Sequence, residues 1–270
     1  MTIDRLRDRH NMTTVGGRAY GLGVMALAIV CLALGDFLPG HPVPKGFPAR
    51  AALAHAVGVF MLVGGVAIVW RRTTPWGAAA LTAYYTLIVV IVMDGRVILA
   101  HYREFLAYSN TAEQLSIAAA GLIVFATSAS IDVTLAARLT RLGQLAFGVC
   151  ALLFGGAHFL YMNLTAPLVP KWLPPTQVFW GYATGIAFIA AGLAILSGVQ
   201  ARLAALLTTV MLALFTVLVH GPMLVGDRLN HGIWTENATN LAIMGAAWVV
   251  AESLARPRRS RRSLETVAPR

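Results

Sequence analysis

Two histidines and a glutamate in the second half of the chain have the residue types of a redox or proton-transfer site. His158 and His220 each lie within an apolar run, and Glu236 stands where the last apolar segment opens. Ionisable groups inside membrane spans are costly and usually face a cavity or a partner. Such a set could bind or deprotonate a quinone, ligate a b-type haem, or hold a metal ion. The spacing is compatible with all three and specific to none, so no metal is assigned.

Five further polar or aromatic residues are predicted to line the same region and to contact a cofactor. They are Asn240, Trp180, Asp36, Asp94 and Glu113. Asn240 follows Glu236 by one helical turn, so both would share a helix face. Glutamates that open a helix can also act as caps, and this is the alternative interpretation of Glu113 and Glu236.

The composition indicates which elements must position these groups. The chain is 58% hydrophobic and 12% charged, with a mean hydropathy of +0.71. A soluble domain of this length could not bury so much apolar surface, whereas a polytopic helical membrane protein exposes it to lipid. Segments long enough to cross a membrane are predicted at 19–37, 51–70, 75–98, 114–133, 144–163, 178–197, 203–225 and 237–254.

The sequence repeats itself at an offset close to 126, which relates residues 34–133 to residues 156–254. For example, Val43-Pro44-Lys45 recurs as Val169-Pro170-Lys171. At two polar positions inside apolar helices the first copy has Asp36 and Asp94, and the second has His158 and His220. Each copy contains four predicted spans, and an even number gives both copies the same orientation. The predicted fold is therefore an all-α, polytopic integral membrane protein with eight transmembrane helices in two parallel four-helix repeats.

The distribution of positive charge predicts the topology. The predicted parts are an N-terminal segment 1–18, a first repeat 19–135, a second repeat 143–254 and a basic tail 255–270. Fifteen of the 21 Lys and Arg residues fall on the face that carries both termini. The positive-inside rule then predicts a multi-pass plasma-membrane protein with both termini in the cytoplasm. The net charge of +10 is interpreted as a topology signal, and no nucleic-acid partner is expected.

The second half resembles the DoxX family of four-helix membrane units. The resemblance is carried by Gly156-Ala-His-Phe159, Leu168-Val-Pro-Lys-Trp-Leu-Pro174, Val219-His-Gly-Pro222 and Asn240-Leu-Ala242. It covers residues 145–254, and residues 20–133 would be a diverged copy without the histidine pair. Founding members of the family are similar to the membrane subunit of a thiosulfate:quinone oxidoreductase. The resemblance thus implies that His158, His220 and Glu236 are the family-type positions.

The functional expectation is a membrane subunit of a quinone-linked oxidoreductase. His158 and His220 would bind or deprotonate the quinone, and Glu236 would pass protons to the outside. The electrons would come from a redox partner subunit or from a bound cofactor, because the chain has no strong redox centre of its own. One alternative is a non-enzymatic carrier of a small molecule or lipid, or a membrane scaffold. Another is a protein that binds b-type haem. Membrane lipid and a second copy of the chain are further expected partners.

Overall fold

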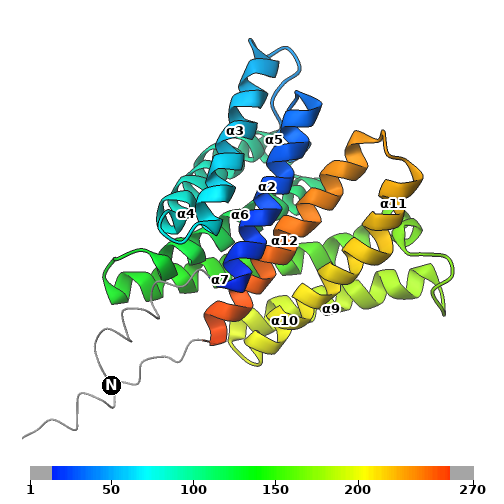
Figure 1. Cartoon of the computed structure of the whole chain (residues 1–270). Helices are drawn as coiled ribbons and strands as arrows, with labels where there is room; N and C mark the ends of the chain where they lie inside the picture. The colour runs from blue at the N-terminus through cyan, green and yellow to red at the C-terminus, as the bar shows by residue number, and fades with distance from the viewer. Residues whose placement is uncertain (1–13, 256–270) are drawn as a thin grey trace, which may run out of the picture.

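The computed structural model of the protein describes residues 14–255, and these residues form helices joined by short loops, without a strand (Figure 1). Eight of the helical stretches are long and apolar enough to cross a membrane. This confirms the prediction of an all-α polytopic protein. The elements are α2 (Val15–Leu34), α3 (Arg50–Val69), α4 (Thr74–Ala83), η1 (Tyr84–Asp94), α5 (Gly95–Ala100), α6 (Phe105–Ser128), α7 (Val133–Leu160), α8 (Met162–Thr165), η2 (Ala166–Leu168), α9 (Gln177–Ser197), α10 (Ala201–Phe215), η3 (Thr216–His220), α11 (Gly221–Gly226) and α12 (His231–Ala255).

Several helices begin well before the apolar segments that predict them. The helix α6 begins at Phe105 and α12 at His231, whereas the apolar segments open at residues 114 and 237. Hydropathy marks the part of a helix that lies in lipid, and a helix continues into the polar interface without that signal. As a result, Glu113 and Glu236 lie in the third and second turns, and the interpretation of these glutamates as caps is wrong.

Both repeats contain a stretch of π-helix at the same place. The segment η1 ends at Asp94 and η3 ends at His220, and a glycine follows each of them. These ends are related by the offset of 126. π-Helical turns often occur at functional sites, because the extra residue in the turn redirects the side chains that follow. The structure therefore marks Asp94 and His220 as equivalent positions, as the sequence predicts.

The first two helices of each repeat pack through glycines at equivalent positions. A Cβ atom on Gly21 of α2 would lie 3.0 Å from the carbonyl oxygen of Gly65 on α3. A Cβ atom on Gly192 of α9 would lie 2.7 Å from the carbonyl oxygen of Gly148 on α7. These pairs are related by an offset of 127, one more than the offset of 126 that relates Val43-Pro44-Lys45 to Val169-Pro170-Lys171 (the VPK repeat). With that offset His158 corresponds to Cys31, so the sequence alignment of His158 with Asp36 is wrong.

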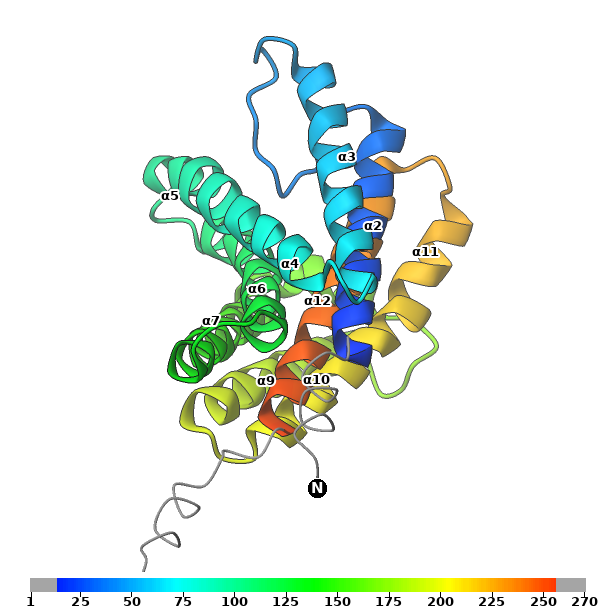
Figure 2. The same ribbon diagram turned by 60° about the vertical axis from the view of Figure 1, so that its left-hand side comes forward.

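The two repeats interleave at the centre of the molecule. The most extensive helix contact joins α2 to α12, and α6 packs in the same way against α7. Thus the first helix of each repeat lies against the last helix of the other, and Figures 1 and 2 show α2 and α12 side by side. The last helices, α6 and α12, also contact each other. This arrangement brings Glu113 on α6 near Glu236 on α12.

Candidate functional site

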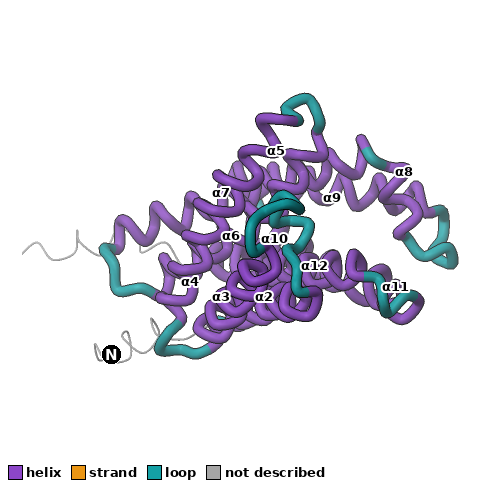
Figure 3. The backbone as a smooth tube through the Cα atoms, turned by 90° about the horizontal axis from the view of Figure 1, so that it is seen from above, coloured by secondary structure: helices purple, strands orange, loops and turns teal. Residues whose placement is uncertain are grey.

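A groove of about 370 Å³ lies between the connection that follows α7 and the end of the seventh span. Figure 3 shows the two flanking parts, the loop after α8 and the helix α11, on the same side of the molecule. The volume of the groove falls at the lower end of the range for small-molecule sites. The lining residues are Pro167, Leu168, Val169, Pro170, Lys171, Trp172, Gln177, Val217, Leu218, Val219, Pro222 and Met223.

Side chains of α9 hold the loop that forms one wall of the groove. The amide of Gln177 donates a hydrogen bond to the carbonyl oxygen of Val169. The indole N–H of Trp180 donates to the carbonyl oxygen of Pro174 over 2.8 Å. Trp180 was predicted to contact a cofactor, but it lines neither this groove nor the second cavity described below. Trp172 takes that place instead, with 70% of its surface exposed.

The groove combines apolar walls with a polar rim. The wall from the seventh span consists of Val217, Leu218, Val219, Pro222 and Met223. The rim from the loop carries the ammonium group of a lysine and the indole of a tryptophan. Such a surface suits a molecule with an apolar tail and a polar head, because the tail avoids water while the head stays at the interface.

His158 lies near the end of α7 and is half-buried. Its Nδ1 atom is 2.8 Å from the carbonyl oxygen of Phe154, which leaves Nε2 as the free ring nitrogen. The ring of Phe188 lies 5.4 Å from the imidazole, centroid to centroid. His158 is not among the residues that line the groove. The structure therefore places it in an aromatic cluster instead of at the rim.

The two π-helical segments each end on a buried polar atom that lacks a partner. Asp94 is only 5% exposed, and its Oδ2 atom has no hydrogen bond within residues 14–255. The Nδ1 atom of His220 is buried without a hydrogen bond to any described residue. Buried polar groups are almost always paired, with protein or with ordered water. Unpaired groups at equivalent positions in both repeats therefore mark these positions as candidates for proton or ligand binding.

Three of the predicted acids are close together between the repeats. Glu113 is near enough to Glu236 and to Asp94 for their charges to interact. Glu113 is half-buried and Glu236 is exposed. Within the part of the chain that the structure describes, no three His, Cys, Asp or Glu side chains form a group that could hold a metal ion. His158, His220 and Glu236 therefore do not form the metal-ligand set considered from the sequence.

Asn240 is a structural residue of the seventh and eighth spans. Its side-chain amide donates to the carbonyl oxygen of Leu212 over 2.9 Å and to the hydroxyl of Thr216 over 2.7 Å. Both acceptors lie where α10 passes into the π-helical segment η3. Asn240 therefore stabilises the irregular backbone that leads to His220 and does not point at the groove.

Asp36 lies in the loop after α2, not inside a helix as predicted. Its carboxylate is 2.7 Å from the Nε atom of Arg50 and accepts a hydrogen bond from the backbone N–H of Phe37. The Arg50 guanidinium, followed by the Phe37 N–H, holds the pKa of this carboxyl below its usual value. Arg50 also donates to the carbonyl oxygens of Val43 and Pro44. Asp36 therefore fixes the loop to α3.

His41 is a buried residue that the sequence analysis did not select. It belongs to the same loop, is only 2% exposed, and lies 5.7 and 5.8 Å from the rings of Tyr84 and Tyr85. Its Nδ1 atom has no hydrogen-bond partner among the described residues, and burial lowers its pKa to about 4. The one sequence feature that could have indicated this burial is Gly40, which directly precedes His41. In the structure, a Cβ atom at Gly40 would lie 2.2 Å from the amide nitrogen of Gln114.

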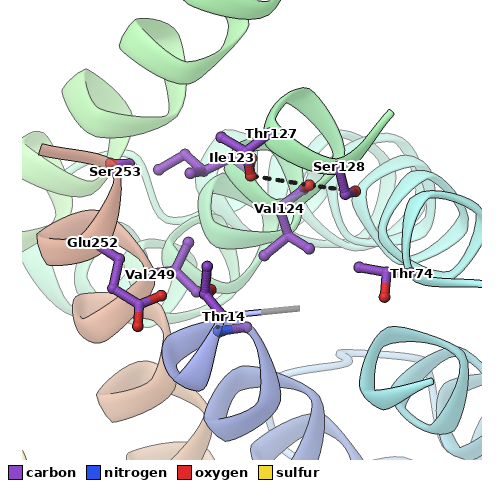
Figure 4. A pocket seen from close by; sticks show the side chains of 10 residues that line it. Thr14, Thr74, Ile123, Val124, Thr127, Ser128, Val249, Glu252 and Ser253 are labelled. Atoms are coloured by element: carbon purple, nitrogen blue, oxygen red, sulfur yellow. Dashed lines mark hydrogen bonds between the residues drawn. The ribbon is translucent and has the colours of Figure 1, made fainter. Parts of the chain in front are cut away.

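A second, much smaller cavity lies where the ends of α2, α6 and α12 meet (Figure 4). Its volume of about 20 Å³ has room for a single water molecule. Glu252 of α12 and Thr14 before α2 line it, together with Thr127 and Ser128 of α6. Glu252 accepts a hydrogen bond from the backbone N–H of Gly16 over 3.0 Å. This site therefore joins helix ends and is too small for an organic ligand.

Comparison with known proteins gives one family match. Residues 147–242 are similar to a family described as a domain of unknown function, DUF8561. The matched region runs from α7 to α12 and contains the groove and both histidines. No match was found among curated proteins or among solved structures. The resemblance to the DoxX family stays a prediction from the residues quoted above.

Proposed function

We propose that this protein binds an amphipathic small molecule of the membrane in the groove beside η3 and α11, as a carrier or binding subunit without chemistry of its own. The groove is the observation that carries this proposal. It has the volume of a ligand site, apolar walls and a polar rim. Of the described residues that line it, none is a histidine, an acid or a cysteine. Binding therefore has stronger support than catalysis.

Analysis of the bound molecules tests this proposal. The protein is purified in a mild detergent, and its small molecules are extracted and identified by mass spectrometry. Leu218→Trp should fill the groove and remove the bound amphiphile. Leu214→Trp is the matched control, because Leu214 lies one turn earlier, is 50% exposed and does not line the groove. Equal amounts of amphiphile in the wild type and in Leu218→Trp would overturn the proposal.

A quinone-linked oxidoreductase subunit of DoxX type is the second candidate function. It is supported by His220, which directly follows the groove residue Val219, and by Glu113, whose charge interacts with those of Glu236 and Asp94. A quinone would place its ring at the rim and its isoprenoid tail along the apolar wall. When bound, a quinone would accept two protons together with two electrons from a redox partner subunit, and His220 would be a candidate to move a proton. Extracted quinone, together with a reduction rate that falls in His220→Ala, would favour this candidate.

A b-type haem between His158 and His220 is the third candidate. Neither of the two cavities described above is lined by either histidine, so the structure gives this candidate less support. The visible absorption spectrum of the purified protein tests it directly. A Soret band that disappears in His158→Ala and in His220→Ala would identify the haem ligands, and a colourless protein would exclude them.

We further propose that the protein lies in the plasma membrane with both termini in the cytoplasm. The support is the excess of Lys and Arg beside the termini and in the loops on that face. A second copy of the chain and a redox subunit remain candidate partners, beside membrane lipid. Labelling of single cysteines introduced at position 46 and position 199 in intact cells tests the orientation. Labelling at position 199 and not at position 46 would reverse it.

A further inference from the structure

Lys171 is the one charged residue among the described residues that line the groove. It is exposed and makes no ion pair within residues 14–255. Two polar side chains at the start of α9 are already engaged by the backbone of this loop. The amide of Gln177 donates to Val169, and the indole of Trp180 donates to Pro174. The head of a bound molecule would therefore meet a positive charge that has no ion-pair partner among the described residues.

The equivalent lysine of the first repeat has a different environment. Lys45 occupies the same place in its Val-Pro-Lys sequence, and its charge interacts with that of Asp36. Arg50 forms an ion pair with the same carboxylate. With the offset of 127, Gln177 corresponds to Arg50 and Asn163 corresponds to Asp36. The second repeat therefore has neither member of the ion pair.

The loops are nevertheless held in the same way. Arg50 donates to the carbonyl oxygen of Val43, and Gln177 donates to that of Val169. The two valines are equivalent in the VPK repeat. The replacement of Arg50 by Gln177 therefore keeps the backbone contact and removes the charge. Its effect is that Lys171 has no ion pair within the described part of the chain.

We infer that the groove binds a single-chain amphiphile whose head is a carboxylate, with Lys171 as its counter-charge. This inference rests on the proposed function, because it names the ligand class of the same groove. One ammonium group matches a monoanion, whereas phosphate heads commonly meet several basic groups. The small volume of the groove favours one acyl chain over two. The head would lie beside Lys171 and Trp172, and the chain along Val217, Leu218 and Met223.

Binding of radiolabelled palmitate to the purified full-length protein in a nonionic detergent tests the inference, with methyl palmitate as the uncharged competitor. Lys171→Gln should weaken palmitate binding about twofold to fivefold, the usual effect of losing one exposed ion pair. Lys171→Arg should restore it. Lys45→Gln is the matched control and should leave the affinity unchanged. Methyl palmitate should compete weakly, and equally in all four proteins.

The outcomes separate this inference from the proposed function. If the ester competes as well as the acid, or if Lys171→Gln binds palmitate normally, the carboxylate assignment is wrong. If dodecyl phosphate binds more tightly than dodecanoate, the head is a phosphate and the assignment is again wrong. The groove itself would still stand if Leu218→Trp abolished binding of acid and ester alike. If neither binds, the carboxylate assignment is wrong, and the proposed function fails as well only if Leu218→Trp leaves the amount of copurified amphiphile unchanged.

Discussion

The buried imidazole of His41 should make the protein unstable in acid. Its pKa is about 4 in the folded chain, against about 6.5 for an exposed histidine. At pH 7 the side chain is neutral in both the folded and the unfolded state. As the pH falls below about 6.5, the unfolded state takes up a proton that the folded state cannot. Stability is therefore full above that pH and is lost progressively as the pH approaches 4, by about 3 kcal/mol in total.

His41→Phe isolates this contribution from those of the other titratable groups. A phenyl ring can pack against Tyr84 and Tyr85, and it removes a buried ring nitrogen that has no partner in the described chain. The variant should be at least as stable as the wild type at pH 7 and should lack about 3 kcal/mol of the acid destabilisation. Thermal unfolding in detergent, followed by tryptophan fluorescence from pH 7 to pH 4, measures the difference. His231→Phe, at an exposed histidine, should keep the wild-type slope. Parallel pH profiles for His41→Phe and the wild type would refute the reasoning.

Three other substitutions test the packing and the loop. Gly245→Ala would place a Cβ atom 2.5 Å from the Cα atom of Tyr20, so α2 and α12 must separate, and we expect a loss of about 3 kcal/mol in unfolding free energy. Gly226→Ala, with nothing within 4 Å of its Cβ atom, should be neutral, and equal unfolding midpoints for the two variants would contradict this prediction. Asn240→Leu leaves the Leu212 carbonyl and the Thr216 hydroxyl without the amide donor. It should lower the unfolding free energy, measured by denaturation in mixed micelles, by about 1–2 kcal/mol relative to the wild type, with Asn237→Leu as the comparison on the same helix. Asp36 has a lowered pKa, so its pairing with Arg50 stabilises the loop above pH 4 and is lost as the pH falls through the lowered pKa. Asp36→Asn should increase the rate of proteolysis of the loop at pH 7 and abolish the pH dependence of that rate below pH 4. A cleavage rate equal to that of the wild type would count against the ion pair.

The eight spans were predictable because lipid imposes a simple condition on sequence. Each span needs about 20 apolar residues, and the hydropathy of this chain satisfies that condition eight times. Helix ends were less predictable, since α6 and α12 continue into polar sequence. The equivalence of Asp94 and His220 was also visible, because Gly95 and Gly221 follow them at the same offset.

The site was only partly predictable, because its contacts depend on the path of the loops. The sequence shows that Lys45 and Lys171 are related, but only the fold shows that one is near an acid and the other lines a groove. The sequence does not distinguish Trp172 from Trp180 as a ligand contact. The structure does, because Trp180 donates to the Pro174 carbonyl and Trp172 lines the groove. His41 lies in a proline-rich loop that appears exposed, and it is buried because Gly40 allows the loop to approach Gln114 closely.

The connections after the first span of each repeat have diverged in conformation, and this divergence explains why one repeat carries the groove. After α2, Gly35 adopts a left-handed conformation with φ of 63°, which ends the helix and turns the chain inward until His41 reaches Tyr84 and Tyr85. After α7, the position that corresponds to Gly35 is Met162, and the chain there forms α8. A methionine disfavours the left-handed turn that glycine adopts freely. The second connection therefore stays at the surface and forms one wall of a groove, whereas the first packs into its repeat with its charges paired to each other. The two repeats therefore differ: the first is the closed half, which carries Asp94 and Glu113, and the second is the open half, which carries the groove that we propose as a ligand site.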